Sequence, residues 1–133
     1  MGKYFSIGEL TRSSVARREG IDNTPPPDAE IRLNQLIDCL LDIVREMWGG
    51  PITVTSGFRS PRLNEAVGGV PSSQHVKGEA ADITVGNPED NRKLFELIRR
   101  SGLEFDQLID ERNYAWIHVS YSAENRCQIL HLG

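Results

Sequence analysis

The stretch Ser73-Gln-His-Val-Lys-Gly-Glu-Ala-Ala-Asp82 is the most informative part of the chain. It places His75 in a glycine-containing loop and leads, seven residues later, to Asp82. Asp82 lies within Ala80-Ala-Asp-Ile-Thr-Val85, whose small and β-branched residues predict a strand. An ionised carboxylate among such neighbours is costly to bury unless it meets a cation or several hydrogen-bond donors. We therefore expect side chains from elsewhere in the fold to meet Asp82.

His118 is a candidate partner, because it lies within Ala115-Trp-Ile-His-Val-Ser120, a second predicted strand. Imidazole nitrogens and carboxylate oxygens are common zinc ligands, and a catalytic zinc site uses three protein ligands and keeps one position open. His75, Asp82 and His118 could form such a set. From the spacing alone another interpretation stays open, in which His118 is a hydrogen-bonded core histidine and Asp82 accepts bonds in a turn or cap. We expect His131 to be a surface or strand-end residue rather than a fourth ligand.

The remaining pattern predicts an α+β fold, with helices first and a small, mostly antiparallel sheet flanked by helices. We expect helices over about 6–18, 28–48 and 88–101, one helical turn near 61–67, and strands over 51–56, 80–85, 105–109, 115–120 and 128–132. Ser6-Ile-Gly-Glu9 is typical of a helix-starting capping box. Cys39 falls inside the apolar pattern of the long helix, so we expect a buried, reduced thiol.

Length and charge limit the possible functions. The 133 residues fit one domain over 1–133, with helices over about 6–48 and the sheet region over about 51–133. The net charge of −4, without a basic block, argues against nucleic acid or a membrane surface as partner, and we expect a monomer.

No stretch approaches the roughly 18 apolar residues of a membrane span. Met1-Gly-Lys-Tyr-Phe-Ser6 contains no apolar run, so we expect no secretory signal and leave the localisation open.

Several motifs resemble, in order and spacing, those of the zinc D-alanyl-D-alanine carboxypeptidases. Ser73-x-His75-x-x-Gly78-x-Ala80-x-Asp82 follows Ser56-Gly-Phe-Arg-Ser-Pro61 and precedes Trp116-Ile-His118. The segment Leu63-Asn-Glu-Ala-Val-Gly-Gly69 is similar to the small cell-wall peptidases of this group. The group includes VanX-type D,D-dipeptidases and bacteriophage endolysin peptidases, and it shares a fold with the hedgehog signalling domain.

The resemblance implies a function and a set of site residues. The implied activity is hydrolysis of peptidoglycan stem peptides, at a D-Ala–D-Ala bond or, as in some endolysins, at L-Ala–D-Glu. One Zn²⁺ ion would be bound by His75, Asp82 and His118. Arg59 matches an arginine that contacts the substrate and stabilises the developing oxyanion, a role that suits a planar, permanently charged group. Ser73 matches a residue that lines the substrate cleft, although its hydroxyl could equally bond nearby backbone.

The motifs leave the identity of the general base open. Many relatives place a glutamate three residues before the last ligand, and this chain has Ala115 there. Glu111 is the candidate at the end of the preceding strand. If a four-residue connection joins the two strands, Glu111 faces Trp116 and shares a sheet face with His118. With a three-residue connection, Asp110 would be the carboxylate on that face.

Two other functions stay open at this point. The absence of a glutamate at position 115 is compatible with a zinc-binding module that has lost catalysis. A phage structural component with a metal-stabilised loop would show the same ligand motifs.

Overall fold

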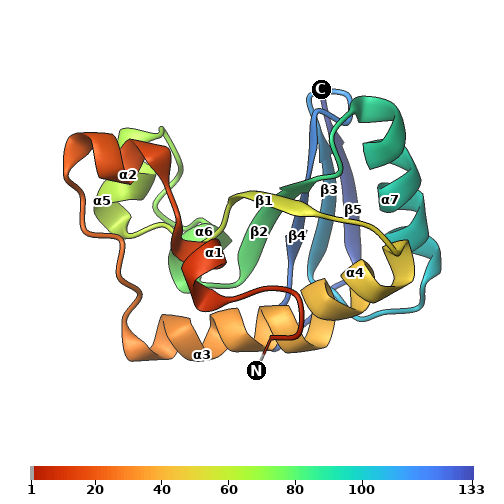
Figure 1. Ribbon diagram of the computed structural model, residues 1–133, viewed down its shortest axis with the longest axis horizontal. Helices are drawn as coiled ribbons and strands as arrows, with labels where there is room; N and C mark the ends of the chain where they lie inside the picture. The colour runs from red at the N-terminus through yellow and green to blue at the C-terminus, as the bar shows by residue number, and fades with distance from the viewer. Residues whose placement is uncertain (1) are drawn as a thin grey trace.

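A five-stranded sheet forms the centre of the computed structural model, which describes residues 2–133 (Figure 1). Its strands, in the spatial order β1-β2-β4-β3-β5, are β1 (Thr53–Ser56), β2 (Ala80–Thr84), β4 (Trp116–Ser120), β3 (Gln107–Glu111) and β5 (Gln128–Leu132). The first three neighbouring pairs are antiparallel, and β5 runs parallel to β3. The predicted α+β class is confirmed, and the sheet is mixed rather than purely antiparallel.

The parallel pairing of β5 follows from the order of the strands. The chain reverses direction after β4 through residues 121–127, as it would in a hairpin. However, β2 and β3 already occupy both sides of β4, so the returning strand pairs with the outer side of β3. β3 and β5 are both antiparallel in direction to β4, and they therefore run parallel to each other.

Helices surround the sheet on both sides (Figure 1). They are α1 (Ile7–Thr11), α2 (Ser14–Glu19), α3 (Pro27–Leu36), the π-helical turn η1 (Ile37–Leu41), α4 (Asp42–Trp48), α5 (Pro61–Ala66), α6 (Gln74–Lys77) and α7 (Pro88–Arg100). Within residues 2–133, none of these helices is long and apolar enough to cross a membrane.

The prediction of one helix over 6–18 is wrong in one respect, because two separate helices, α1 and α2, occupy this segment. The predicted start is confirmed, since the Ser6 hydroxyl accepts a hydrogen bond from the amide of Glu9. Arg12 and Ser13 then adopt extended backbone angles, and the Ser13 hydroxyl accepts from the amide of Ala16. A second capping serine thus starts a new helix in a different direction.

The long helix predicted over 28–48 is confirmed as the continuous run of α3, η1 and α4. Its apolar side, which includes Leu40, Leu41 and Val44, is buried. The prediction for Cys39 is wrong, because this residue is exposed. Leu40 and Leu41 occupy the core-facing side of the π-helical turn, which leaves Cys39 on the opposite side.

The two faces of the sheet have different roles. One face packs against the long helix and α7, and its buried residues are Ala81, Ile83, Leu108, Ile117 and Val119. From α7, the side chains of Leu94, Phe95 and Ile98 enter the same core. The opposite face carries the polar side chains of the candidate site. Burial of the first face therefore anchors strands whose other face is free for chemistry.

A smaller helical part with α1, α2, α5 and α6 lies beside this polar face (Figure 1). Ala16, Ile21 and Leu63 form a small core of their own between α2 and α5. Two glycines let this part approach the rest of the chain closely. A Cβ on Gly57 would lie 2.2 Å from the carbonyl oxygen of Leu10, and a Cβ on Gly78 would lie 2.5 Å from that of Ala29.

The contact at Gly78 leads to a prediction with a matched control. Gly78 and Gly102 both have a φ of +80°, but a Cβ on Gly102 would meet nothing within 4 Å. We expect Gly102→Ala to lower the free energy of unfolding by about 1 kcal/mol through backbone strain alone. Gly78→Ala should lower it by at least about 2 kcal/mol, because the Ala29 backbone must also move. Urea unfolding measures both values, and equal losses would contradict the close approach.

Candidate metal site

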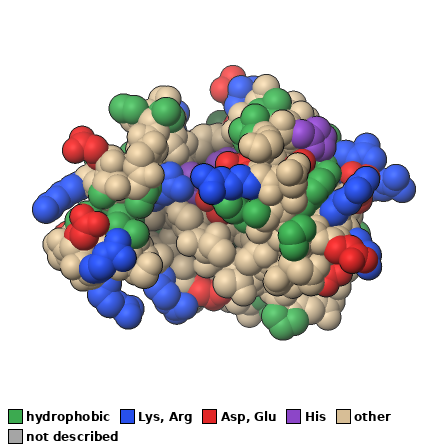
Figure 2. Space-filling model, turned by 90° about the horizontal axis from the view of Figure 1, so that it is seen from above, with side chains coloured by type: hydrophobic (Ala, Val, Ile, Leu, Met, Phe, Trp, Pro, Cys, Tyr) green, Lys and Arg blue, Asp and Glu red, His purple; other side chains and the backbone are tan. Residues whose placement is uncertain are grey.

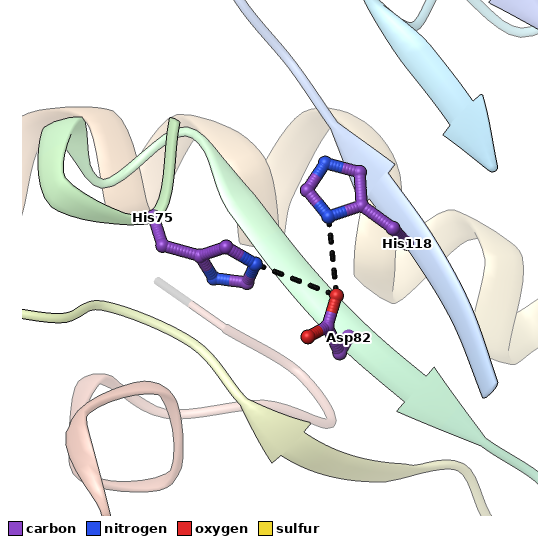
Figure 3. A group of neighbouring side chains, drawn as sticks. All are labelled: His75, Asp82 and His118. Atoms are coloured by element: carbon purple, nitrogen blue, oxygen red, sulfur yellow. Dashed lines mark hydrogen bonds and ion pairs between the residues drawn. The ribbon is translucent and has the colours of Figure 1, made fainter. Parts of the chain in front are cut away.

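Three residues far apart in the sequence converge at one point of the polar face: His75, Asp82 and His118 (Figure 3). Each offers one possible ligand atom, and these atoms lie within 4.8 Å of one another. The Oδ1 atom of Asp82 lies 3.4 Å from Nε2 of His75 and 3.1 Å from Nδ1 of His118. The carboxylate thus lies between the two imidazole rings.

Strand register places two of the three side chains together. β2 and β4 pair so that Asp82 lies directly opposite His118, and directly opposite residues point to the same face. The third side chain comes from α6, a helical turn absent from the sequence prediction. The αL residue Gly78 ends α6 and turns the chain into β2.

The ring of His75 is held in place by the backbone. Its Nδ1 lies 2.7 Å from the carbonyl oxygen of Gly57. A carbonyl only accepts, so Nδ1 carries the proton and donates, and Nε2 is the atom that faces Asp82. Metal-binding histidines commonly donate their other ring nitrogen in this way, which fixes the ring for ligation.

Burial and charge at Asp82 fit a cation site. His75, Asp82 and His118 are 4%, 7% and 8% exposed. Burial by itself raises the pKa of Asp82, but hydrogen bonds from His118 and then His75 outweigh it and hold the pKa well below the usual value. A buried carboxylate and two imidazoles are a donor set that suits one divalent ion and leaves a coordination position open. These residues could therefore hold one metal ion.

Arg59 lies next to this cluster, with its Nη2 atom 3.7 Å from Oδ2 of Asp82. Its Nε donates to the Ser56 hydroxyl, and its Nη1 donates to Oδ1 of Asn64. Asn64 is 2% exposed and also donates to the carbonyl of Val70. Neither Ser56 nor Asn64 was predicted to be functional, although both lie in segments that carry the family resemblance.

Ser73 lies at the start of α6, beside the larger of two cavities. Its hydroxyl accepts a hydrogen bond from the amide of His75 at 3.1 Å and so caps α6. It also lines the cavity onto which His118 opens.

The hairpin between β3 and β4 places Glu111 on the polar face. Ile109 lies opposite His118 and Glu111 opposite Trp116, which confirms the four-residue connection. Asp110 points to the other face, so the alternative that it shares the face of His118 is wrong. There its carboxylate accepts from the amide of Tyr114 and pairs with His131 at 2.9 Å. His131 thus lies away from the candidate ligands, as expected.

Two cavities lie near the cluster, one lined by His118 and one by Arg59. His118 opens onto one of about 660 Å³, which Ser73 and Glu111 also line. Arg59 lines the other, of about 350 Å³. Figure 2 shows a hollow between the two parts of the molecule, with histidine and acidic side chains in it and basic side chains beside it. A chain-like ligand could therefore pass over the metal site.

A second buried carboxylate lies at the larger cavity. Asp106 is 2% exposed and pairs with the guanidinium of Arg126 at 2.9 Å. Gln74, which precedes His75 in the chain, donates a hydrogen bond to Oδ2 of Asp106 at 2.7 Å. The hydrogen bonds from Arg126, followed by that from Gln74, outweigh burial and hold the pKa of Asp106 well below its usual range. This network was not predicted, because nothing in the local sequence pattern relates these three positions.

Comparisons with known proteins found a matching family and a similar protein. Residues 3–120 match the model of a protein family described as Peptidase M15. The zinc D-Ala-D-Ala carboxypeptidase of Streptomyces albus G is 43% identical to the chain over 61 residues. The matched part covers 44% of this chain and 24% of that relative, so the chain spans about a quarter of the relative's length.

The ligand set predicts the effect of removing one imidazole. We expect His118→Ala to weaken the binding of added Zn²⁺ by at least about 100-fold, because a three-ligand site loses a direct bond. His131→Ala should leave the affinity unchanged, since that ring lies on the other face. Competition with a fluorescent chelator measures both constants. Equal affinities for His118→Ala and the unmodified protein would rule out the site.

The lowered pKa of Asp106 predicts how stability depends on pH. A carboxyl group with a lower pKa in the folded state stabilises the fold above its unfolded pKa of about 4, and this contribution is lost as the pH falls. Asp106→Asn should therefore be destabilising at pH 7, with a deficit that shrinks below pH 4. Urea unfolding across this range measures the deficit, with Asp28→Asn, an exposed site, as control. A deficit that does not change with pH would exclude the ionised pair as its cause.

Proposed function

The chain belongs to the peptidase M15 family, and on this basis we propose that it is a zinc-dependent peptidase that hydrolyses peptidoglycan stem peptides. The observation that carries the proposal is the convergence of His75, Asp82 and His118 at a cavity that Glu111 also lines. The name of the Streptomyces relative supports both the metal and the substrate class.

The three ligands would hold Zn²⁺ through two imidazoles and one carboxylate. Bound there, Zn²⁺ supplies Lewis acidity, which polarises a carbonyl group and makes water more acidic. The ligands also keep this chemistry in a partly enclosed place, since all three are buried. The fixed ring of His75 and the paired strands β2 and β4 require little reorganisation for binding.

Glu111 is the proposed general base. It lies on the face of His118 and at the end of β3, while Ala115 occupies the turn before β4. The register thus brings a carboxylate toward the site from the neighbouring strand, where many relatives use a residue of the ligand's own strand. Glu111 would take a proton from the water that attacks the carbonyl carbon. It would return this proton to the amine as the C–N bond breaks.

Arg59 is the proposed electrostatic partner of the reaction. Its guanidinium is bonded to Ser56 and Asn64, so it is already oriented toward the site. It would stabilise the negative charge that develops on the carbonyl oxygen. Ser73 is proposed to contact the substrate from the rim of the larger cavity.

We propose the D-Ala–D-Ala bond as the bond that is cleaved, following the name of the relative. Cleavage at L-Ala–D-Glu is the endopeptidase alternative. The cavities near the proposed metal site are compatible with either bond, and product analysis distinguishes the two activities.

The experiment measures release of free amino groups from purified peptidoglycan by the zinc-loaded protein. Glu111→Gln should lower the rate by about 100-fold or more, which is typical of the loss of a general base, while zinc affinity stays unchanged. Glu89→Gln, at an exposed position of α7, is the control and should keep the full rate. If the unmodified protein releases nothing from varied wall peptides, the chain is better described as a metal-binding module without catalysis.

A further inference from the structure

The larger cavity has a fixed arginine at some distance from the metal site. We propose that Arg126 binds a carboxylate of the substrate two or three residues away from the scissile bond, and that Asp106 positions it. This inference rests on the proposed function, because it assigns a substrate feature to the same cleft.

The guanidinium of Arg126 is held by two parallel hydrogen bonds. Nε donates to Oδ1 of Asp106 at 2.9 Å, and Nη2 donates to Oδ2 at 3.0 Å. The backbone amide of Arg126 also donates to Oδ1, at 3.0 Å. Such two-pronged pairs fix the plane of the guanidinium as well as its position. The side chain nevertheless remains 52% exposed and lines the cavity.

Asp106 is in turn fixed to the framework of the metal site. Its amide donates to the carbonyl of Ser120 on β4, the strand of His118. Its Oδ2 atom accepts from Gln74 at 2.7 Å, and Gln74 precedes His75 in α6. Arg126 therefore has a defined position relative to both histidines, as a residue that selects a substrate group requires.

The free donors of Arg126 indicate what it would bind. A guanidinium has five N–H groups, and the pair with Asp106 uses one on Nε and one on Nη2. Within residues 2–133, the Nη1 atom has no acceptor at hydrogen-bond distance. Two N–H groups on a planar frame match a carboxylate better than a single peptide carbonyl. Lys77 lines the same cavity and adds a second positive charge, while Glu79, Glu111 and Glu124 also line it.

The position along the sheet sets the distance from the reacting bond. Asp106 bonds to Ser120, which lies two residues beyond His118 on β4. A strand advances about 3.3 Å per residue, so this bond lies about 7 Å from His118 along β4. An extended peptide covers such a span with roughly two or three residues.

The loop that carries Arg126 lies outside the part of the chain that matches the family model. Residues 121–127 follow β4 and lie beyond residues 3–120, the part that matches the family model. The candidate ligands, Arg59 and Glu111 all lie within the matched part. A group outside it is suited to substrate selection rather than to the shared chemistry.

Binding to the metal-free protein tests the proposal without turnover. The probes are the pentapeptide L-Ala-γ-D-Glu-L-Lys-D-Ala-D-Ala, in which the γ-carboxyl of D-Glu is joined to Lys, and two analogues. One analogue is amidated at the C-terminus and the other at the free α-carboxyl of D-Glu. Calorimetry of the chelator-treated protein should show that the D-Glu amide binds about tenfold more weakly than the free acid, as expected for a lost charged hydrogen bond. Arg126→Gln should remove this difference by weakening the peptides that keep the D-Glu carboxylate, the free acid and the C-terminal amide. Arg100→Gln, the same charge change on α7, should preserve it.

Turnover by the zinc-loaded protein gives the second readout. Arg126→Gln should raise KM about tenfold for the free acid. The kcat values and the KM of the D-Glu amide should stay unchanged. A loss of loop structure would instead affect acid and amides alike, and equal changes for all three peptides would overturn the proposal. If the unmodified protein binds with the expected preference but cleaves no peptide, the proposed peptidase function fails and the role of Arg126 in binding stands.

Discussion

The structure depends on one cross-strand pair, Asp82 on β2 opposite His118 on β4. A buried carboxylate is unfavourable unless it meets donors or a cation, and here two imidazoles and Arg59 surround it. This requirement explains the placement of α6, which brings His75 to the same oxygen atom. It also explains why the sheet packs only one face into the main core and keeps the other face polar.

The cleft results from the close approach of two parts of the chain. Gly57 and Gly78 lie against the backbone of the N-terminal segments with no room for a side chain. Gly57 also presents its carbonyl oxygen to the ring of His75. Packing of the helical part and orientation of a candidate ligand are thus coupled, because the same backbone segment serves both.

Two buried carboxylates organise the proposed reacting end and the proposed recognition end of the cleft. Asp82 gathers the groups suited to a metal ion, while Asp106 holds Arg126 at the larger cavity. Gln74 and His75 are neighbours in α6. Gln74 contacts Asp106, and His75 contacts Asp82. A helical turn of four residues therefore connects the two ends, and a shift of α6 would alter both at once.

Local patterns in the sequence were sufficient for the α+β class, the long helix, the closing strand over 128–132 and the candidate ligands, because these depend on periodicity, turn residues and motif spacing. Even the face of Glu111 followed from strand alternation once the hairpin length was known. The break between α1 and α2 follows from a second local cap at Ser13, and the exposure of Cys39 from its side of the long helix, neither of which the apolar spacing revealed. Tertiary packing decided the rest: the parallel pairing of β5 and the Asp106–Arg126 pair. These two features arise from competition for one place beside a strand and from contacts between residues distant in sequence, and such interactions leave no periodic trace in the chain.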